Sequence, residues 1–239
     1  MTAPVTHVEH VMGTVFSFTV RDPGPRTAAT LERIVTRLHR IDELFSTYRP
    51  ESEISRLGRG ELPLTACDPD VGWVLDRCAE LTAETDGYFT ATPGGRLDPS
   101  GYVKGWAVEE ASRALRDSGS GHHCVSGGGD VQTAGGPWRI GIADPHRPGA
   151  VARVVTGHDL AVATSGTAER GPHILDPHTG RPATTLASLT LLGPHLTRLD
   201  ALTTAAFAMP TPLPWLTTHN IPALAIHPDG HHEHTPTFP

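Results

Sequence analysis

Residues 27–45 carry the pattern that most restricts how this chain can fold. Apolar side chains recur there at the spacing of one face of an α-helix: Leu31, Ile34, Val35, Leu38, Ile41, Leu44 and Phe45. A second helical pattern runs through 71–81 and ends near Gly87, a natural C-terminal cap. A third begins near Gly101 or Tyr102. Long helices are therefore expected early in the chain.

Short β-branched and apolar segments dominate the rest of the chain. They predict one strand before the first helix and several after the third, at 11–20, around Cys124, and at 138–142, 151–156, 160–163, 188–192 and 223–227. A short helix is expected at 199–208. Early helices followed by hairpin-like strands predict an α+β fold with largely antiparallel pairing. We expect residues 1–239 to form a single domain of two fused lobes, with 228–239 as a loose tail.

Composition narrows the class of protein. Of 239 residues, 38% are hydrophobic and 19% are charged, which allows a real core and argues against disorder. The net charge of −7 argues against nucleic acid as the main partner. Residues 1–10 show no secretory signal pattern, and no apolar run is long enough to insert into a membrane, so a cytoplasmic location is expected. Cys67, Cys78 and Cys124 lack metal-ligand spacing and are expected to be buried free thiols.

Lysine usage singles out one residue. The chain has 18 arginines and one lysine, Lys104. Arginine replaces lysine on a solvated surface but not where a compact point charge is needed. Lys104 is therefore a candidate for chemistry, and the alternative is that it persists by chance.

Two polar or glycine-rich segments lie in the first fifty residues. Gly13, in Val11–Thr14, either lets a ligand approach the backbone or forms an ordinary strand bulge. The hydroxyl-rich segment Phe45–Arg49 contains Tyr48, whose ring is suited to stacking on a flat ligand. A capping loop explains the same residues equally well.

Two further segments precede and follow the third helix. Asp98 and Ser100 lie just before its start, where free backbone N–H groups favour anions, and Lys104 follows closely. A lysine there opposes the helix dipole unless an anion is bound, although Asp98 is also explained as a cap. Three glycines in Ser126–Val131 cost conformational entropy, so close packing or a ligand is expected to require them.

The last group is the strongest. Ala163–Gly166 is followed by His173–Pro177 and by Thr179–Gly180. Asp200 and Thr204, four residues apart, share one helix face and offer the hard oxygens that suit Mg²⁺. The alternative is an N-terminal aspartate bonded to its own helix.

These segments together resemble the FAD:protein FMN transferases, the ApbE family, from Met12 to Met209. The resemblance lies in the order and spacing of seven motifs: MGT at 12–14, FSTY at 45–48, the segment 98–105, GGD at 128–130, TSG at 164–166, the HIIDP-like and TG elements at 173–180, and the helix at 200–204. It implies a T-fold-like α+β architecture with an FAD cleft between lobes and Mg²⁺ at the pyrophosphate. It also implies a transferase that splits FAD, releases AMP and joins FMN to a threonine of a target protein.

The resemblance also implies residue roles. Asp200, Thr204 and the Gly101 carbonyl would hold Mg²⁺, with Thr203 lending a backbone or hydroxyl oxygen. FAD would be contacted by two groups of residues, the polar pair Lys104 and Asp98 and the pocket-lining set Met12, Tyr48, Tyr88, Phe89, Thr90 and Ile174. His173 is the candidate general base, which a hydroxyl nucleophile needs. Asp176 would orient it.

Two positions depart from the family pattern. Thr90 stands where an aspartate is common, and Gly58 where an asparagine is common. Both leave substrate use open. Three hypotheses remain: transfer of FMN to a protein threonine, hydrolysis of FAD to FMN and AMP, and a non-catalytic flavin-binding module.

Overall fold

A single large antiparallel sheet forms the centre of the molecule. The computed structural model describes residues 3–168 and 171–239. The sheet has eight strands in the order β1-β2-β3-β4-β7-β8-β9-β10, and β5 and β6 form a separate hairpin. The strands are β1 Val5–Val11, β2 Thr14–Val20, β3 His123–Gly127, β4 Asp130–Ala134, β5 Trp138–Ala143, β6 Val151–Gly157, β7 Ala161–Gly166, β8 Ser188–Gly193, β9 Ala223–Ile226 and β10 His232–His234.

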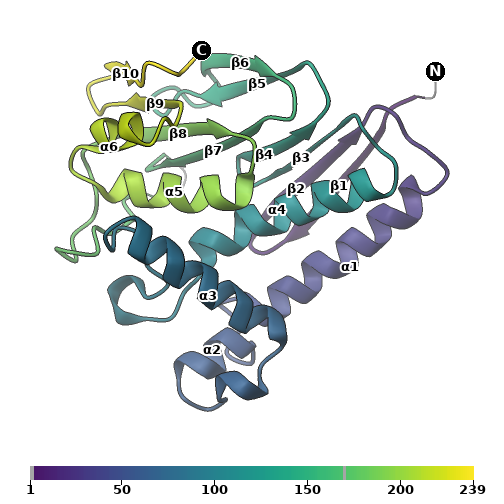
Figure 1. Ribbon diagram of the computed structural model, residues 1–239, viewed down its shortest axis with the longest axis horizontal. Helices are drawn as coiled ribbons and strands as arrows, with labels where there is room; N and C mark the ends of the chain where they lie inside the picture. The colour runs from purple at the N-terminus through teal and green to yellow at the C-terminus, as the bar shows by residue number, and fades with distance from the viewer. Residues whose placement is uncertain (1–2, 169–170) are drawn as a thin grey trace.

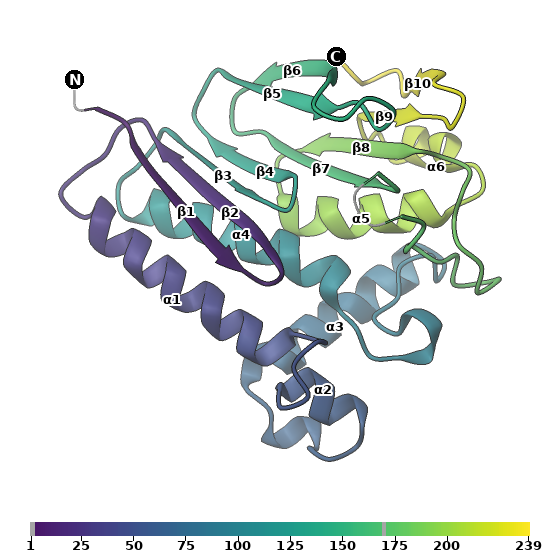
Figure 2. The ribbon, with the colours of Figure 1, turned by 180° about the vertical axis from the view of Figure 1, so that it is seen from behind.

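Three long helices lie along one face of this sheet (Figures 1 and 2). They are α1 Thr27–Phe45, α4 Ser100–Asp117 and α5 Leu196–Ala208. The remaining helices are α2 Glu53–Gly58, α3 Pro69–Glu84 and α6 Pro212–Thr218. In both views α2 and α3 lie beyond α4, away from the sheet. No helix of the described ranges is long and apolar enough to cross a membrane.

Strands β7 to β9 are buried on both faces. Alternate residues such as Ala161 and Leu191 join the main core under the helices. Their neighbours Val162 and Leu192 join a second core with Ile142 of β5. Because successive side chains of a strand point to opposite faces, the β5–β6 hairpin covers the face opposite the helices. This double burial explains why these strands are nearly continuous apolar runs in the sequence.

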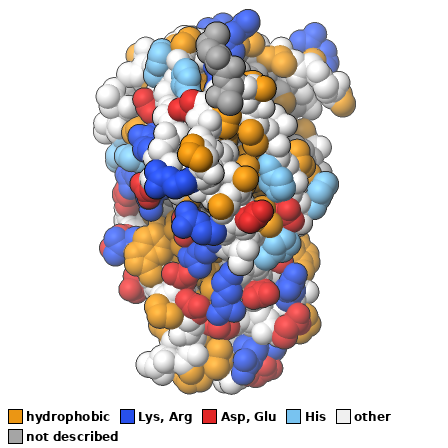
Figure 3. Space-filling view, turned by 90° about the vertical axis from the view of Figure 1, so that its right-hand side faces the viewer, with side chains coloured by type: hydrophobic (Ala, Val, Ile, Leu, Met, Phe, Trp, Pro, Cys, Tyr) orange, Lys and Arg blue, Asp and Glu red, His pale blue; other side chains and the backbone are white. Residues whose placement is uncertain are grey.

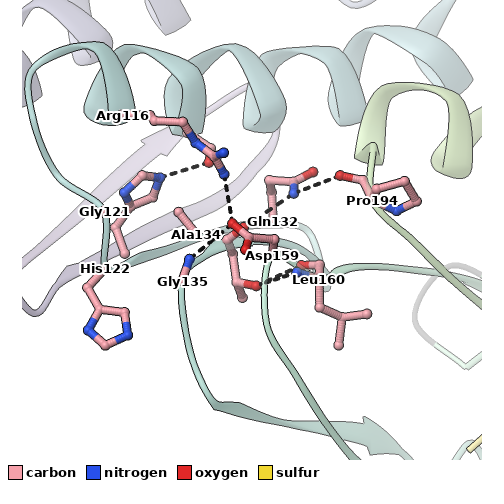
Figure 4. A network of polar contacts seen from close by, with 12 residues as sticks. Arg116, Gly121, His122, Gln132, Ala134, Gly135, Asp159, Leu160 and Pro194 are labelled. Carbon is pink, nitrogen blue, oxygen red and sulfur yellow. Dashed lines mark hydrogen bonds and ion pairs between the residues drawn. The ribbon is translucent and has the colours of Figure 1, made fainter.

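Polar contacts attach the β5–β6 hairpin at its base. Figure 4 shows Asp159, which precedes β7, accepting from the Gly135 N–H at 3.1 Å. The same Oδ1 atom lies 3.1 Å from the Arg116 guanidinium of α4. Asp159 therefore links the base of the β5–β6 hairpin to the C-terminal end of α4.

Charges of both signs are interspersed on the face in Figure 3. The ion pairs of α1 follow the same arrangement. Arg37 pairs with Asp70 and Glu110, and Arg40 pairs with Asp68. Positive and negative side chains thus neutralise each other locally.

The predicted α+β class with antiparallel pairing is confirmed, and so are the three predicted long helices, which are α1, α3 and α4. The predicted strand at 11–20 is shorter, because Met12 (φ 56°) and Gly13 (φ 67°) form a tight turn that separates β2 from Val11, the last residue of β1. Such a turn needs left-handed backbone at both central positions. Helix α5 starts earlier than expected, at Leu196, and α2, α6, β1, β4 and β10 were not predicted.

The C-terminal segment 228–239 differs most from expectation. The prediction of a loose tail was wrong, because β10 pairs with β9 and Phe238 is only 7% exposed. Thr235 adds two hydrogen bonds to the Ala223 N–H and the Ile221 carbonyl. The segment has few apolar residues, so only its contact with the second core reveals its order.

Candidate active site

Helices α4 and α5 meet at Gly105 and Asp200. A β-carbon at Gly105 would lie 2.7 Å from Asp200 Cβ and 2.9 Å from the Leu196 carbonyl oxygen. Real Cβ atoms do not approach so closely, so only glycine permits this contact. The Gly105 N–H donates to Asp200 Oδ2 at 2.9 Å. In an α-helix the same N–H also donates to the carbonyl four residues earlier, here that of Gly101. Asp200 and the Gly101 carbonyl therefore share one donor.

The predicted metal-binding residues are largely brought together by this crossing. A β-carbon at Gly101 would lie 3.6 Å from Thr204 Oγ1. Asp200 is one turn away on the same face of α5 and is 4% exposed. Thr203 is fully buried, and its hydroxyl donates to the Leu199 carbonyl at 2.7 Å. Its side chain therefore contacts its own helix.

Lys104 lies between two buried carboxylates. Its Nζ atom contacts Asp130 Oδ2 and lies 3.3 Å from Asp200 Oδ1. Burial lowers the pKa of Lys104, but the charges of Asp200 and Asp130 outweigh it and raise that pKa above its usual range. Burial and the charge of Asp200 hold the pKa of Asp130 above its usual value, although Lys104 opposes this rise. Lys104 is therefore held as an ammonium between Asp130 and Asp200.

Asp130 is the residue that sequence reasoning missed. It belongs to the GGD turn, and its sequence context indicated no role for it. It is fully buried, and its Oδ1 accepts from the Thr164 N–H at 2.9 Å. A carboxylate directly after three glycines, between two strands, was the available signal.

Two hairpin turns border the lysine. Met12 and Gly13 join β1 to β2, while Gly128 (φ 58°) and Gly129 (φ 90°) join β3 to β4. A β-carbon at Gly128 would lie 3.2 Å from both Lys104 Cδ and the hydroxyl oxygen of Thr14. Close packing requires glycine at Gly127, where a β-carbon would lie 2.8 Å from Val108 Cγ2, whereas Gly128 and Gly129 are favoured by their positive φ. The Met12 side chain is half-buried against the main core.

The 88–98 segment supplies an aromatic surface and a polar turn before α4. Tyr88 packs edge-on against His178, with ring centroids 4.5 Å apart. Phe89 is buried beside Gly101, and Thr90 bonds Thr92. Asp98 Oδ1 accepts from the Ser100 N–H at 3.0 Å, but the N-cap position of α4 is Pro99, so Asp98 forms a turn just before the helix and does not cap it.

Tyr48 and Ile174 occupy opposite environments. Tyr48 is 93% exposed, so its ring is free to stack. The loop around it is held by Arg96, which donates to the Thr47 carbonyl at 2.8 Å. Ile174 is partly buried against the main core.

His173 and Asp176 lie in the loop before β8. His173 is exposed, and its Nδ1 is 3.0 Å from the Gly171 carbonyl. Asp176 accepts from the His178 N–H and the Thr179 hydroxyl, each at 2.9 Å. Burial acts to raise the pKa of Asp176, but these hydrogen bonds hold it below its usual value. The predicted orientation of His173 by Asp176 has no counterpart among the described contacts, because Asp176 caps its own turn.

Two cavities lie apart from these residues. One, of about 310 Å³, is beside Asp144, His146 and His232. The other, of about 240 Å³, lies between α1 and α4. Neither cavity is lined by Lys104, Asp130 or Asp200.

Fold and site together define an antiparallel α+β protein with an ammonium and two carboxylates enclosed where two hairpin turns meet two helices. A sequence model described as the ApbE family matches residues 12–95 and 90–225. The chain belongs to the ApbE family.

Individual relatives agree with this assignment. The FAD:protein FMN transferase of Vibrio cholerae serotype O1 is 26% identical over 83% of this chain and 79% of the relative. That of Haemophilus influenzae is 24% identical over 83% and 78%. Among solved structures, the ApbE protein of Thermotoga maritima has a TM-score of 0.88 at 23% identity, covering 98% of this chain and 97% of that one. The flavin transferase ApbE of Vibrio cholerae has a TM-score of 0.83, also at 23% identity, covering 98% of each chain.

Proposed function

We propose that this chain is an FAD:protein FMN transferase that uses Mg²⁺ to attach FMN to a threonine hydroxyl of a target protein. The observation that carries the proposal is the convergence of Gly101, Lys104, Asp200 and Thr204 where α4 crosses α5. The family and the names of the relatives support the same activity.

The oxygen donors at this crossing fit Mg²⁺. Asp200 supplies a carboxylate, Thr204 a hydroxyl and Gly101 a carbonyl, all hard ligands of the kind Mg²⁺ prefers. Within the described ranges no three His, Cys, Asp or Glu residues are grouped as a metal centre. A bound ion would therefore complete its shell with phosphate and water oxygens, which is usual for Mg²⁺ at nucleotides. The ion would neutralise charge on the transferred phosphoryl group.

The reaction requires one bond to form and one to break. The threonine oxygen attacks the phosphorus on the FMN side of the pyrophosphate, and the bond from that phosphorus to the AMP oxygen breaks. AMP leaves with the electron pair, and the hydroxyl proton goes to His173. Asp176 shapes the loop that carries His173, and is thus a positioning residue. Lys104 and Asp98 would contact the phosphates and ribose of bound FAD. Met12, Tyr48, Tyr88, Thr90 and Ile174 would line its ring pockets, and Phe89 would support them from the core.

Mass spectrometry tests the proposal directly. Purified protein is incubated with FAD, Mg²⁺ and an acceptor domain that carries a threonine, and the acceptor is weighed. We expect an FMN adduct with wild type and with Asp117→Ala, an exposed aspartate at the end of α4, and none with Asp200→Ala. AMP without an adduct would instead indicate hydrolysis. Intact FAD throughout would contradict catalysis and favour a flavin-binding module.

A further inference from the structure

Each buried carboxylate beside Lys104 has one oxygen fixed by the backbone and the other facing the ammonium. Asp130 Oδ1 accepts from the Thr164 N–H, and Asp200 Oδ2 accepts from the Gly105 N–H, both at 2.9 Å. The remaining oxygens, Asp130 Oδ2 and Asp200 Oδ1, contact Lys104 Nζ. In residues 3–168 and 171–239, Lys104 forms the only salt bridges of either aspartate.

The charges of this group do not balance. One ammonium faces two carboxylates, both almost fully buried, and buried charge is costly unless it is paired. The oxygen of Asp200 that faces Lys104 is also the one left free by Gly105. A cation approaching that oxygen would meet the ammonium, and the two like charges would repel each other.

We propose that Lys104 is a tethered counter-ion that occupies the cation position at Asp200 until a divalent ion binds, and that Asp130 is the positioning residue that retains the ammonium afterwards. This inference rests on the proposed Mg²⁺ site. Asp130 suits the role because it is fully buried and because its position is set by the β7 backbone, through the hydrogen bond from the Thr164 N–H.

The surrounding backbone leaves room for this arrangement. The aliphatic stem of Lys104 passes over Gly128, where a β-carbon would lie 3.2 Å from Cδ. The Lys104 side chain is 24% exposed, so part of it reaches the surface of the site.

Mn²⁺ binding in the absence of FAD, followed by electron paramagnetic resonance, tests the exchange. Lys104→Met removes the competing charge, so Mn²⁺ affinity should rise by at least about ten-fold, the effect expected of one nearby unit charge. Asp130→Asn leaves Asp200 as the only carboxylate for Lys104, so Mn²⁺ affinity should fall by about the same factor. Lys104→Met and Asp130→Asn break the same contact but should change Mn²⁺ affinity in opposite directions.

A double variant covers the case in which Lys104→Met does not fold. Lys104→Met with Asp130→Asn removes one charge of each sign and leaves Asp200 open, and it should bind Mn²⁺ more tightly than wild type. Lys104→Met should also gain thermal stability on addition of Mg²⁺ by a larger shift than wild type, because ligands that bind the folded state stabilise it.

The outcomes separate this inference from the proposed function. Equal or weaker Mn²⁺ binding by the lysine variants, with binding still abolished by Asp200→Asn, would overturn the counter-ion role and leave the metal site standing. Mn²⁺ binding that does not depend on Asp200, with or without FAD, would overturn the metal site and this inference with it.

Discussion

His123 Nε2 lies 2.8 Å from Ser112 Oγ, and this buried contact joins β3 to the middle of α4. The other ring nitrogen, Nδ1, lies 3.1 Å from Ser120 Oγ, whose hydroxyl donates to Asp22. Asp22 also accepts from the Gly121 and His122 N–H groups. A neutral histidine is therefore enclosed in a complete hydrogen-bond network behind the active-site helix.

This histidine makes stability depend on pH. Burial lowers the pKa of His123 from 6.5 to about 4. Between these values the unfolded chain takes up a proton that the folded protein does not, so stability falls as pH falls through this window. A depression of this size corresponds to about 3 kcal/mol. Urea unfolding of wild type and His123→Gln at pH 7, 6 and 5 measures it.

The variant should lose stability at pH 7 but show a flatter pH dependence. His158→Ala, at an exposed position, is the control and should follow wild type. Parallel curves for wild type and His123→Gln would refute the assignment.

Gly105→Ala should destabilise the protein. The added carbon would stand 2.7 Å from Asp200 Cβ, and overpacking of this kind costs about 1–3 kcal/mol. Gly72→Ala, in α3, is a matched control, because a β-carbon there meets nothing within 4 Å. That change should stabilise by about 0.5–1 kcal/mol, since alanine favours a helix. Chemical denaturation compares the two, and equal effects would speak against the tight crossing.

Phe238→Ala tests the order of the C-terminal segment. Phe238 is 7% exposed and belongs to the second core with Ile142 and Val155. Truncating a buried phenylalanine costs about 3–5 kcal/mol, whereas Phe238→Leu keeps most of the apolar volume and should cost less. Thermal unfolding separates the variants. No loss of stability in Phe238→Ala would restore the loose tail.

His173→Ala tests the proposed base. Losing a general base lowers a rate by about 10²–10⁴-fold, so transfer of FMN should fall by that factor while the circular dichroism spectrum is unchanged. His178→Ala is the control in the same loop, where loss of the Tyr88 contact should raise the KM for FAD more than it lowers kcat. Equal losses of kcat in both variants would show that the rate depends on the structure of the loop and not on the His173 imidazole.

Much of the fold was predictable because its signals are local. The apolar stripe of α1 gave its bounds, Thr27 to Phe45, without error. The strands β7 to β9 were recognisable as apolar runs because both of their faces are buried. Helix α2 was not predicted, although Ser52 caps it by accepting from the Ser55 N–H, because six residues carry too little periodicity.

The site divides in the same way. Motif order alone indicated the family, and the i and i+4 spacing alone placed Asp200 and Thr204 on one helix face. The partners of Lys104 were not readable, because Asp130 and Asp200 are 26 and 96 residues away along the chain. The hydrogen bonds of Asp176 were not readable either, because Asp176 accepts from residues of its own turn and not from His173.

The sequence by itself determined helices α1, α3 and α4, the antiparallel α+β class and the order of motifs that indicates the family, because periodicity, glycine placement and motif spacing act over short stretches of chain. Only the tertiary structure decided that the single lysine is held between two buried carboxylates, that Met12 lies in a turn and that the last residues close a second core. These features depend on which distant segments pack together, and that is settled by burial and steric fit across the whole chain.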